Sequence, residues 1–166
     1  MWRELPANTE WFEVELTPAD LERIRFFPRA DWRRIAQGSF HLTDVVERIR
    51  PHMAGSFEDD FFGKLRLLSC SVQENLVNAT VLLIGIDNTG PLTILDGNHR
   101  IAAALLSQAS VHNRFRFICG FSPNMTRCCW YATNVNTLLR YFKNLVRYFS
   151  YDPESDIDRF QEHMPL

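Results

Sequence analysis

Hydrophobic and charged residues alternate near the start of the chain, over residues 11–16. Phe12, Val14 and Leu16 would lie on one face of an extended segment, and acidic residues, Glu13 among them, on the other. A period of two is typical of a strand with one buried face. The pattern predicts a half-buried strand whose acidic face is exposed.

A spacing of three and four between apolar positions is typical of an amphipathic helix. It covers three segments, which are residues 19–24, 42–53 and 134–149. The first follows Thr17 and Pro18, a capping residue and a proline suited to the first helical turn. The last segment is the longest, and we expect the acidic tail from 150 onward to be partly disordered.

Two continuous apolar runs, 80–86 and 92–95, are joined by a polar turn and predict a buried hairpin. Residues 115–121 predict a further core strand. Residues 54–63 are expected to form a surface connection, and the type of element over 64–72 stays open.

Residues 25–34 follow neither period and combine aromatic with basic side chains, such as Phe26, Trp32 and Arg33. We expect an irregular segment here, with two interpretations. Such a stretch can stack a base and bind phosphate. Alternatively, the aromatic rings pack in the core and the arginines lie at its rim.

Composition limits the functional classes. The chain has 166 residues, 46% of them hydrophobic, which suffices for one domain over residues 1–166 with a helical extension from about 134. A net charge of −2 gives no overall positive field that would favour binding of nucleic acid. The net charge does not exclude a local basic patch that binds nucleic acid. No apolar stretch is long enough to span a bilayer and no signal peptide is apparent, so we expect a cytoplasmic protein.

The four cysteines lack the paired spacing of a zinc site. They are Cys70, Cys119, Cys128 and Cys129. We expect free thiols in a reducing compartment, with the adjacent pair buried rather than redox-active.

The most informative stretch is residues 93–108, where an apolar strand meets an Asp-Gly turn and then an alanine-rich helix that Asn98 can cap. The first N–H groups of a helix lack intrahelical acceptors and favour anions. Gly97 allows the backbone to approach a ligand, and His99 and Arg100 add donors. Taken together, these residues predict a phosphate site, whereas each alone is also compatible with an ordinary turn.

Residues 94–103 read ILDGNHRIAA, and this segment resembles the Asp-Gly-x-His-Arg signature of the ParB/sulfiredoxin superfamily. The resemblance implies an α+β fold with a small mixed sheet flanked by helices, in which the motif cradles nucleotide phosphates. The superfamily includes sulfiredoxins, ParB-type nucleotide switches and nucleases, and kinases that phosphorylate free serine with ATP or ADP. The shared motif does not choose among these chemistries.

The first hypothesis is an ATP- or ADP-dependent phosphotransferase, a kinase acting on a small hydroxylated metabolite such as an amino acid. Gly97 and Asn98 would supply backbone N–H groups, and His99 and Arg100 would offset charge on the transferred group. Asp96 would orient an acceptor hydroxyl or hold Mg²⁺ through water, unless its side chain merely caps the turn.

The resemblance further implies a general base from the N-terminal part of the chain, and position alone points to Glu13 or Glu10. Sulfiredoxins place their catalytic cysteine where this chain has Asn98, so sulfinic-acid repair is disfavoured. Two alternatives stay open: a nucleotide-binding switch or partner-binding module without turnover, and a nuclease. The sequence gives no oligomeric state.

Overall fold

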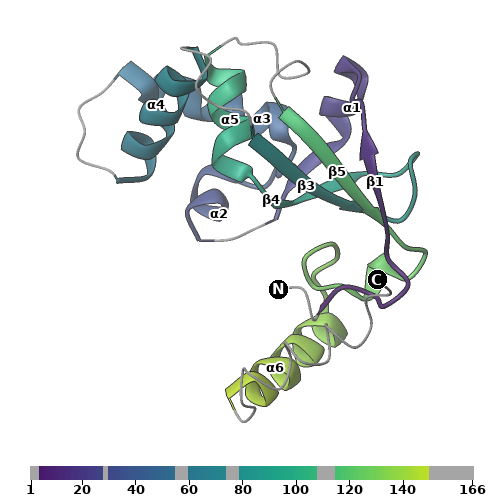
Figure 1. The fold of residues 1–166 in the computed structure, drawn as a ribbon. Coiled ribbons are helices and arrows are strands. Elements are labelled where there is room, and N and C mark those ends of the chain that lie inside the picture. The colour runs from purple at the N-terminus through teal and green to yellow at the C-terminus, as the bar shows by residue number, and fades with distance from the viewer. Residues whose placement is uncertain (1–3, 28–29, 55–59, 74–78, 108–114, 150–166) are drawn as a thin grey trace.

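A five-stranded mixed sheet carries helices on one side in the computed structural model (Figure 1). The structure describes residues 4–27, 30–54, 60–73, 79–107 and 115–149. The strands are β1 (Glu10–Val14), β2 (Ile24–Phe26), β3 (Ala79–Gly85), β4 (Leu92–Asp96) and β5 (Phe115–Phe121). The α-helices are α1 (Pro18–Arg23), α2 (Ala30–Ala36), α3 (Leu42–Ile49), α4 (Asp60–Gln73), α5 (Asn98–Leu106) and α6 (Val135–Phe149). Short 3₁₀ turns are η2 (Arg50–Ala54) and η3 (Met125–Arg127).

The strand order is β1-β5-β3-β4-β2. The predicted hairpin is confirmed, because β3 and β4 are antiparallel neighbours at the centre of the sheet. The predicted strand β5 runs parallel to β3, and β1 and β2 form the two edges. The motif strand β4 is thus held on both sides, which fixes the position of the turn that follows it.

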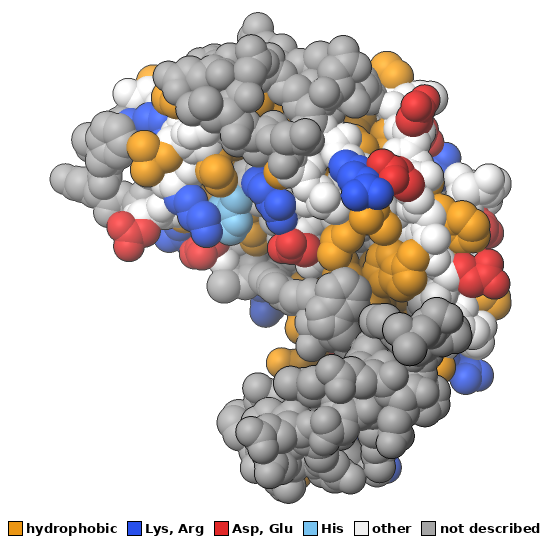
Figure 2. Space-filling view, viewed as in Figure 1, with side chains coloured by type: hydrophobic (Ala, Val, Ile, Leu, Met, Phe, Trp, Pro, Cys, Tyr) orange, Lys and Arg blue, Asp and Glu red, His pale blue; other side chains and the backbone are white. Residues whose placement is uncertain are grey.

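The main core lies between the sheet and helices α2 to α5. The predicted apolar face of α3 is confirmed: Leu42, Val45, Val46 and Ile49 are buried. The small residues of α5 let α4 approach closely, and the Ser69 hydroxyl donates to the Ala103 carbonyl at 3.1 Å. Seen from the same side, charged side chains and one histidine gather below these helices (Figure 2).

Residues 25–34 are not the irregular segment that we expected. Phe26 ends β2, which pairs in parallel with β4, and α2 begins at Ala30. Phe26 and Trp32 are buried and stacked with their ring centroids 4.2 Å apart. The core-packing interpretation of the aromatic residues is therefore confirmed. The three residues of β2 are too few to show a strand period in the sequence. They form a strand because they pair with β4.

Three further expectations need correction. Helix α4 begins at Asp60, inside the expected surface connection, and it also settles the open segment 64–72. The remainder of that connection, 55–59, lies outside the described residues. Ile24 belongs to β2 rather than to the preceding helix. Phe12 is 48% exposed because β1 is an edge strand.

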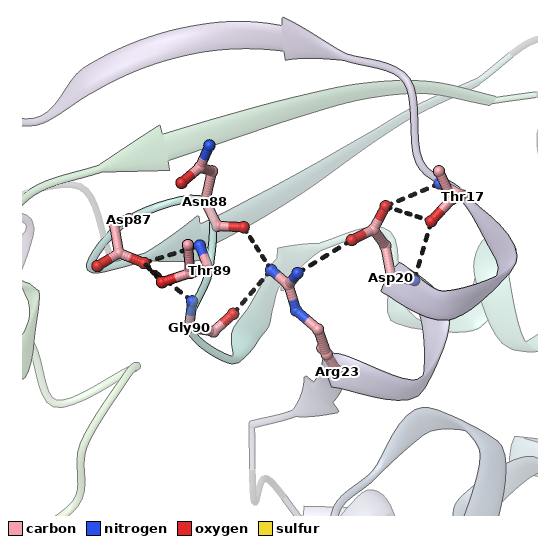
Figure 3. Close-up of polar contacts among 7 residues, drawn as sticks. All are labelled: Thr17, Asp20, Arg23, Asp87, Asn88, Thr89 and Gly90. Atoms are coloured by element: carbon pink, nitrogen blue, oxygen red, sulfur yellow. Dashed lines mark hydrogen bonds and ion pairs between the residues drawn. The ribbon is translucent and has the colours of Figure 1, made fainter.

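Arg23 joins α1 to the turn of the central hairpin (Figure 3). Its guanidinium donates to the carbonyl oxygens of Asn88 at 2.7 Å and Gly90 at 3.0 Å, and to the Asp20 carboxylate at 3.1 Å. Asp20 in turn accepts from the backbone N–H and hydroxyl of Thr17, which completes the predicted cap of α1. This network ties the N-terminal helix to the strand pair that carries the motif.

We expect Arg23→Ala to lower the free energy of unfolding by about 1–2 kcal/mol, because two carbonyl acceptors lose a charged donor at a partly exposed site. Urea titration would measure the loss. Arg50→Ala is the matched control, since Arg50 pairs only with the exposed carboxylate of Glu47 among the contacts described for it, and a loss under about 0.5 kcal/mol is expected. Equal losses in the two variants would contradict the proposed role of Arg23.

No helix in the described part of the chain is both long enough and apolar enough to cross a membrane.

Candidate functional site

The motif forms the junction between β4 and α5. Gly97 is the N-cap residue of α5, with φ 99° and ψ 12°, and no side chain caps this helix. Asn98 is thus the first helical residue, and the expected Asn98 cap is wrong. An α-helix leaves its first N–H groups without intrahelical acceptors, so those of Asn98, His99 and Arg100 can bind a ligand.

Backbone geometry and packing both require glycine at position 97. Its positive φ is one that residues with a Cβ rarely adopt. A Cβ at this position would also lie 3.1 Å from Cγ2 and 3.3 Å from Cα of Val81, on the neighbouring strand β3. The turn is thereby pressed against the sheet, and the start of α5 has a fixed position and direction.

A cavity of about 510 Å³ opens at this turn. Its lining residues come from α2, α4, β4 and α5, and they are Asp31, Trp32, Lys64, Leu68, Leu95, Asp96, Gly97, Asn98, His99 and Arg100. All five residues of the motif line one cavity. Asp31 and Lys64 were missed in the sequence, where no motif marks them and only the packing of α2 and α4 brings them here.

Arg100 and Asp96 form an ion pair across the first turn of α5, with Nη2 2.9 Å from Oδ2. The Arg100 side chain is 31% exposed and that of Asp96 is 61% exposed. The carboxylate therefore accepts from the guanidinium, and the proposed capping of the turn by Asp96 is not observed. The pair holds Arg100 at the cavity while leaving donors on the guanidinium for a second acceptor.

Asn98 lines the same cavity and also carries a buried polar atom. Its side-chain oxygen is fully shielded and accepts no hydrogen bond from the described residues. An unsatisfied buried acceptor costs about 1–3 kcal/mol, and because this oxygen is shielded, a ligand in the cavity reaches it only if the Asn98 side chain rotates.

His99 packs against two aromatic rings, with its ring centroid 5.1 Å from that of Trp32 and 5.4 Å from that of Phe61. Burial lowers the pKa of His99 below its ordinary value of 6.5, and the charge of Lys64 lowers it further, whereas Asp31 opposes the shift. The imidazole is therefore neutral at pH 7. A bound anion would reverse this balance by favouring the charged form.

We expect acid to destabilise the folded chain through His99. Because the pKa of His99 is lower in the folded chain than in the unfolded chain, unfolding takes up a proton as the pH falls below 6.5. The free energy of unfolding should thus decrease between about pH 7.5 and about pH 5.5, and less so in His99→Gln. Urea titrations at both pH values would measure the difference, with the exposed His52→Gln as control. An unchanged acid sensitivity in His99→Gln would exclude this role.

Glu13 and Glu10 lie outside this cavity, on edge strand β1. Glu13 shares a row across the sheet with Ile118, Leu82 and Asp96. Three strand spacings separate its Cα from that of Asp96 by about 14 Å. The role of Glu13 as general base stays a prediction, and the structure does not bring it to the motif.

Glu13 instead lines a separate surface cavity of about 520 Å³. There it accepts from Nε and Nη2 of Arg116 at 2.8 and 2.7 Å. The side-chain hydrogen bond from Arg116 lowers the pKa of Glu13, while slight desolvation opposes the shift. This carboxylate is held charged by its partner.

The cysteines do not line the cavity at Asp96–Arg100, which we call the motif cavity. Cys119, Cys128 and Cys129 are buried, as expected for the adjacent pair, and Cys70 is exposed. Burial raises the pKa of Cys119 and of Cys129 to about 12. These thiols are neutral at pH 7, which makes them poor nucleophiles.

The cavity can bind an oxyanion between the first N–H groups of α5 and the two permanent cations, Lys64 and Arg100. The carboxylates of Asp31 and Asp96 line the same cavity. In the described ranges, no three or more His, Cys, Asp or Glu side chains are grouped so that they could hold a metal ion. No protein-family model matches the chain, and no curated protein or solved structure matches it either.

Proposed function

We propose that the chain binds ATP or ADP in the motif cavity and transfers a phosphoryl group to the hydroxyl of a small metabolite such as an amino acid. The observation that carries this proposal is the uncapped start of α5, which opens into a cavity lined by Lys64, His99 and Arg100. Helix N–H groups, a fork-shaped guanidinium and an ammonium group are complementary to a chain of phosphates.

The proposed positions of the phosphates follow from these donors. The N–H groups of Asn98 and His99 would hold one phosphate, and Arg100 would bind a second with the guanidinium donors that Asp96 does not use. Lys64 lines the cavity from helix α4. Its ammonium group would neutralise the negative charge that develops on the phosphoryl group during transfer. Positioning and neutralisation are the main demands of phosphoryl transfer.

Mg²⁺ fits this site as a ligand shared with the nucleotide. One lining carboxylate, Asp96, would hold it, which agrees with the preference of this ion for one or two carboxylates together with water and phosphate oxygens. When bound, Mg²⁺ supplies neutralisation of phosphate charge. The chain's own residues position the phosphates and receive the proton.

Asp31 is the best placed general base, since it lines the cavity and Glu13 does not. In the proposed step, the acceptor oxygen forms a bond to the terminal phosphorus and its proton passes to the Asp31 carboxylate. The bond from that phosphorus to the bridging oxygen breaks, and the shortened nucleotide leaves.

We further propose a ParB/sulfiredoxin-like fold. Two observations support this: the motif lies between a strand and a helix, and an antiparallel hairpin leads into it. Both are features that the sequence resemblance implies. The coarser description, a mixed α+β fold, does not depend on this proposal.

The test is a pair of assays on the full chain. Calorimetry with ATP and with ADP, each with and without Mg²⁺, measures binding, and transfer of labelled phosphate to a panel of hydroxylated amino acids measures turnover. We expect saturable binding and transfer to at least one acceptor, with transfer lost in Asp31→Asn while nucleotide binding is retained. Absence of nucleotide binding would overturn the proposal.

A switch without turnover is the second candidate, and one observation favours it. Each lining carboxylate already has a cationic neighbour: Arg100 lies 2.9 Å from Asp96, and Arg34 lies 3.9 Å from Asp31. Nucleotide binding with no transfer to any acceptor would support the switch. Salt-sensitive cleavage of DNA would instead support the nuclease alternative.

A further inference from the structure

Strand β1 forms one edge of the sheet, and no described strand pairs with its outer side (Figure 1). It pairs with β5 on the inner side only. Phe12, Glu13 and Val14 make no backbone hydrogen bond to a described residue outside the sheet. An open edge presents N–H and C=O groups that can pair with an extended segment of another chain. This edge is therefore a candidate binding surface.

The side chains of β1 give this edge two different faces. Phe12 lies opposite Cys119, a core residue on the helix-covered side of the sheet, and Val14 points to the same side. The Phe12 ring contacts that of Phe121 with centroids 6.0 Å apart, yet Phe12 stays exposed because no strand lies beyond it. Glu13 points to the opposite face. An added strand would therefore place apolar side chains beside Phe12 and polar ones beside Glu13.

Charge restricts which segment can bind at this edge. Glu10, Glu13 and Glu15 are all exposed along it. Arg116 on β5 pairs with Glu13, whereas Glu10 and Glu15 form no ion pair within the described part of the chain. The edge therefore carries an excess of negative charge. A second copy of β1 would bring the same carboxylates together, so like charges oppose pairing between two copies. A segment with basic residues is favoured instead.

The surface cavity that Glu13 lines lies at the end of the same edge. Glu15 brings a second carboxylate to this cavity, and Leu16, Phe115 and Phe117 give it apolar walls. The side chains of lysine and arginine combine an alkyl stem with a charged end, so they can pack on apolar walls while the cation meets a carboxylate. The cavity therefore suits a basic side chain of an added strand.

We propose that β1 binds an extended segment of another protein in which lysine or arginine alternates with apolar residues. The segment adds a strand to the sheet, and its backbone hydrogen bonds to residues 12–14 supply affinity. Its apolar side chains pack beside Phe12 and Val14, and its basic side chains meet Glu13 and Glu15. This surface shares no lining residue with the motif cavity, so binding here does not require a nucleotide.

The probe for this edge is a synthetic seven-residue peptide of alternating lysine and valine. Fluorescence anisotropy of the labelled peptide measures its affinity for the full chain, and NOEs between the peptide and residues 12–14 identify the added strand. We expect saturable binding together with these NOEs. A fully N-methylated form keeps the charge but donates no backbone hydrogen bond, so its affinity should be about tenfold lower. Equal affinity of the two peptides would overturn the proposal, because charge alone would explain binding.

Matched variants locate the binding surface on β1. Glu13→Gln/Glu15→Gln should weaken peptide binding about tenfold, because both carboxylates of the cavity lose their charge. Glu22→Gln/Glu47→Gln removes the same charge from exposed residues of α1 and α3 and should bind the peptide as the parent does. Equal losses in the two variants would show attraction by net charge and overturn the proposal. In sedimentation of the chain alone, a dimer that the peptide dissociates would overturn it in favour of a second copy.

Discussion

Arg100→Ala is expected to weaken ATP binding by about 10–100-fold, because a bidentate charged hydrogen bond to phosphate contributes about 1.5–3 kcal/mol. The same change removes only a partly exposed ion pair with Asp96 from the fold. Its cost in stability is therefore about 0.5 kcal/mol, which lowers Tm by less than about 2 °C. Calorimetric titration with ATP and a thermal melt of the same preparation would measure the two effects.

Arg33→Ala is the matched control for this variant. Arg33 is an exposed arginine of the neighbouring helix α2, and it does not line the cavity. Both variants lose one positive charge, but ATP affinity should be unchanged in Arg33→Ala because Arg33 does not line the cavity. If Arg100→Ala binds ATP as tightly as the parent, Arg100 does not contact the phosphates. If both variants lose affinity equally, the effect is one of net charge.

The sequence predicted those elements whose structure depends on neighbouring residues in the chain. The central hairpin, strand β5, helix α3 and the capped start of α1 all follow from short-range patterns, and all are confirmed. The motif turn belongs to this group, since an Asp-Gly pair after a buried strand restricts the backbone to few conformations. The predicted strand, turn and helix at residues 93–106 are accordingly present in the structure.

Where contacts between distant segments decide the structure, the sequence prediction failed. Strand β2 has three residues and is ordered by pairing with β4, more than sixty positions away. Asp31 and Lys64 reach the motif only because α2 and α4 pack beside α5. The assignment of Asn98 as a cap failed for a local reason: Gly97 is itself the N-cap residue, and Asn98 is the first residue of the helix.

Periodicity also predicted apolar faces without predicting what covers them. Phe12 shows the period of a strand and Leu139 that of a helix, yet the two are 48% and 63% exposed. On α3 the same kind of pattern is fully buried. The difference lies in position, because β1 has a neighbour on one side only and α6 contacts the rest of the chain through Asn144 and Tyr141. An apolar stripe therefore indicates a contact surface, and only the fold shows whether the partner is the core.

Gly97→Ala is expected to affect stability and ligand binding together. A Cβ at φ 99° is strained, and this one would also press on the Val81 backbone at 3.3 Å, which cannot rotate away as a side chain can. We expect a loss of about 3 kcal/mol in the free energy of unfolding. ATP binding should fall even under conditions in which the variant is fully folded, because relief of the contact moves the first N–H groups of α5. Urea titration and calorimetry would measure the two losses.

Gly38 allows the two causes to be separated. It has almost the same backbone conformation, with φ 100°, but a Cβ there would meet nothing within 4 Å. Gly38→Ala should therefore report backbone strain alone, about 1–2 kcal/mol, with ATP affinity unchanged. The excess loss in Gly97→Ala is then the cost of the Val81 contact. Equal losses at the two glycines, with binding intact at both, would mean that close packing of the turn against β3 does not position the anion site.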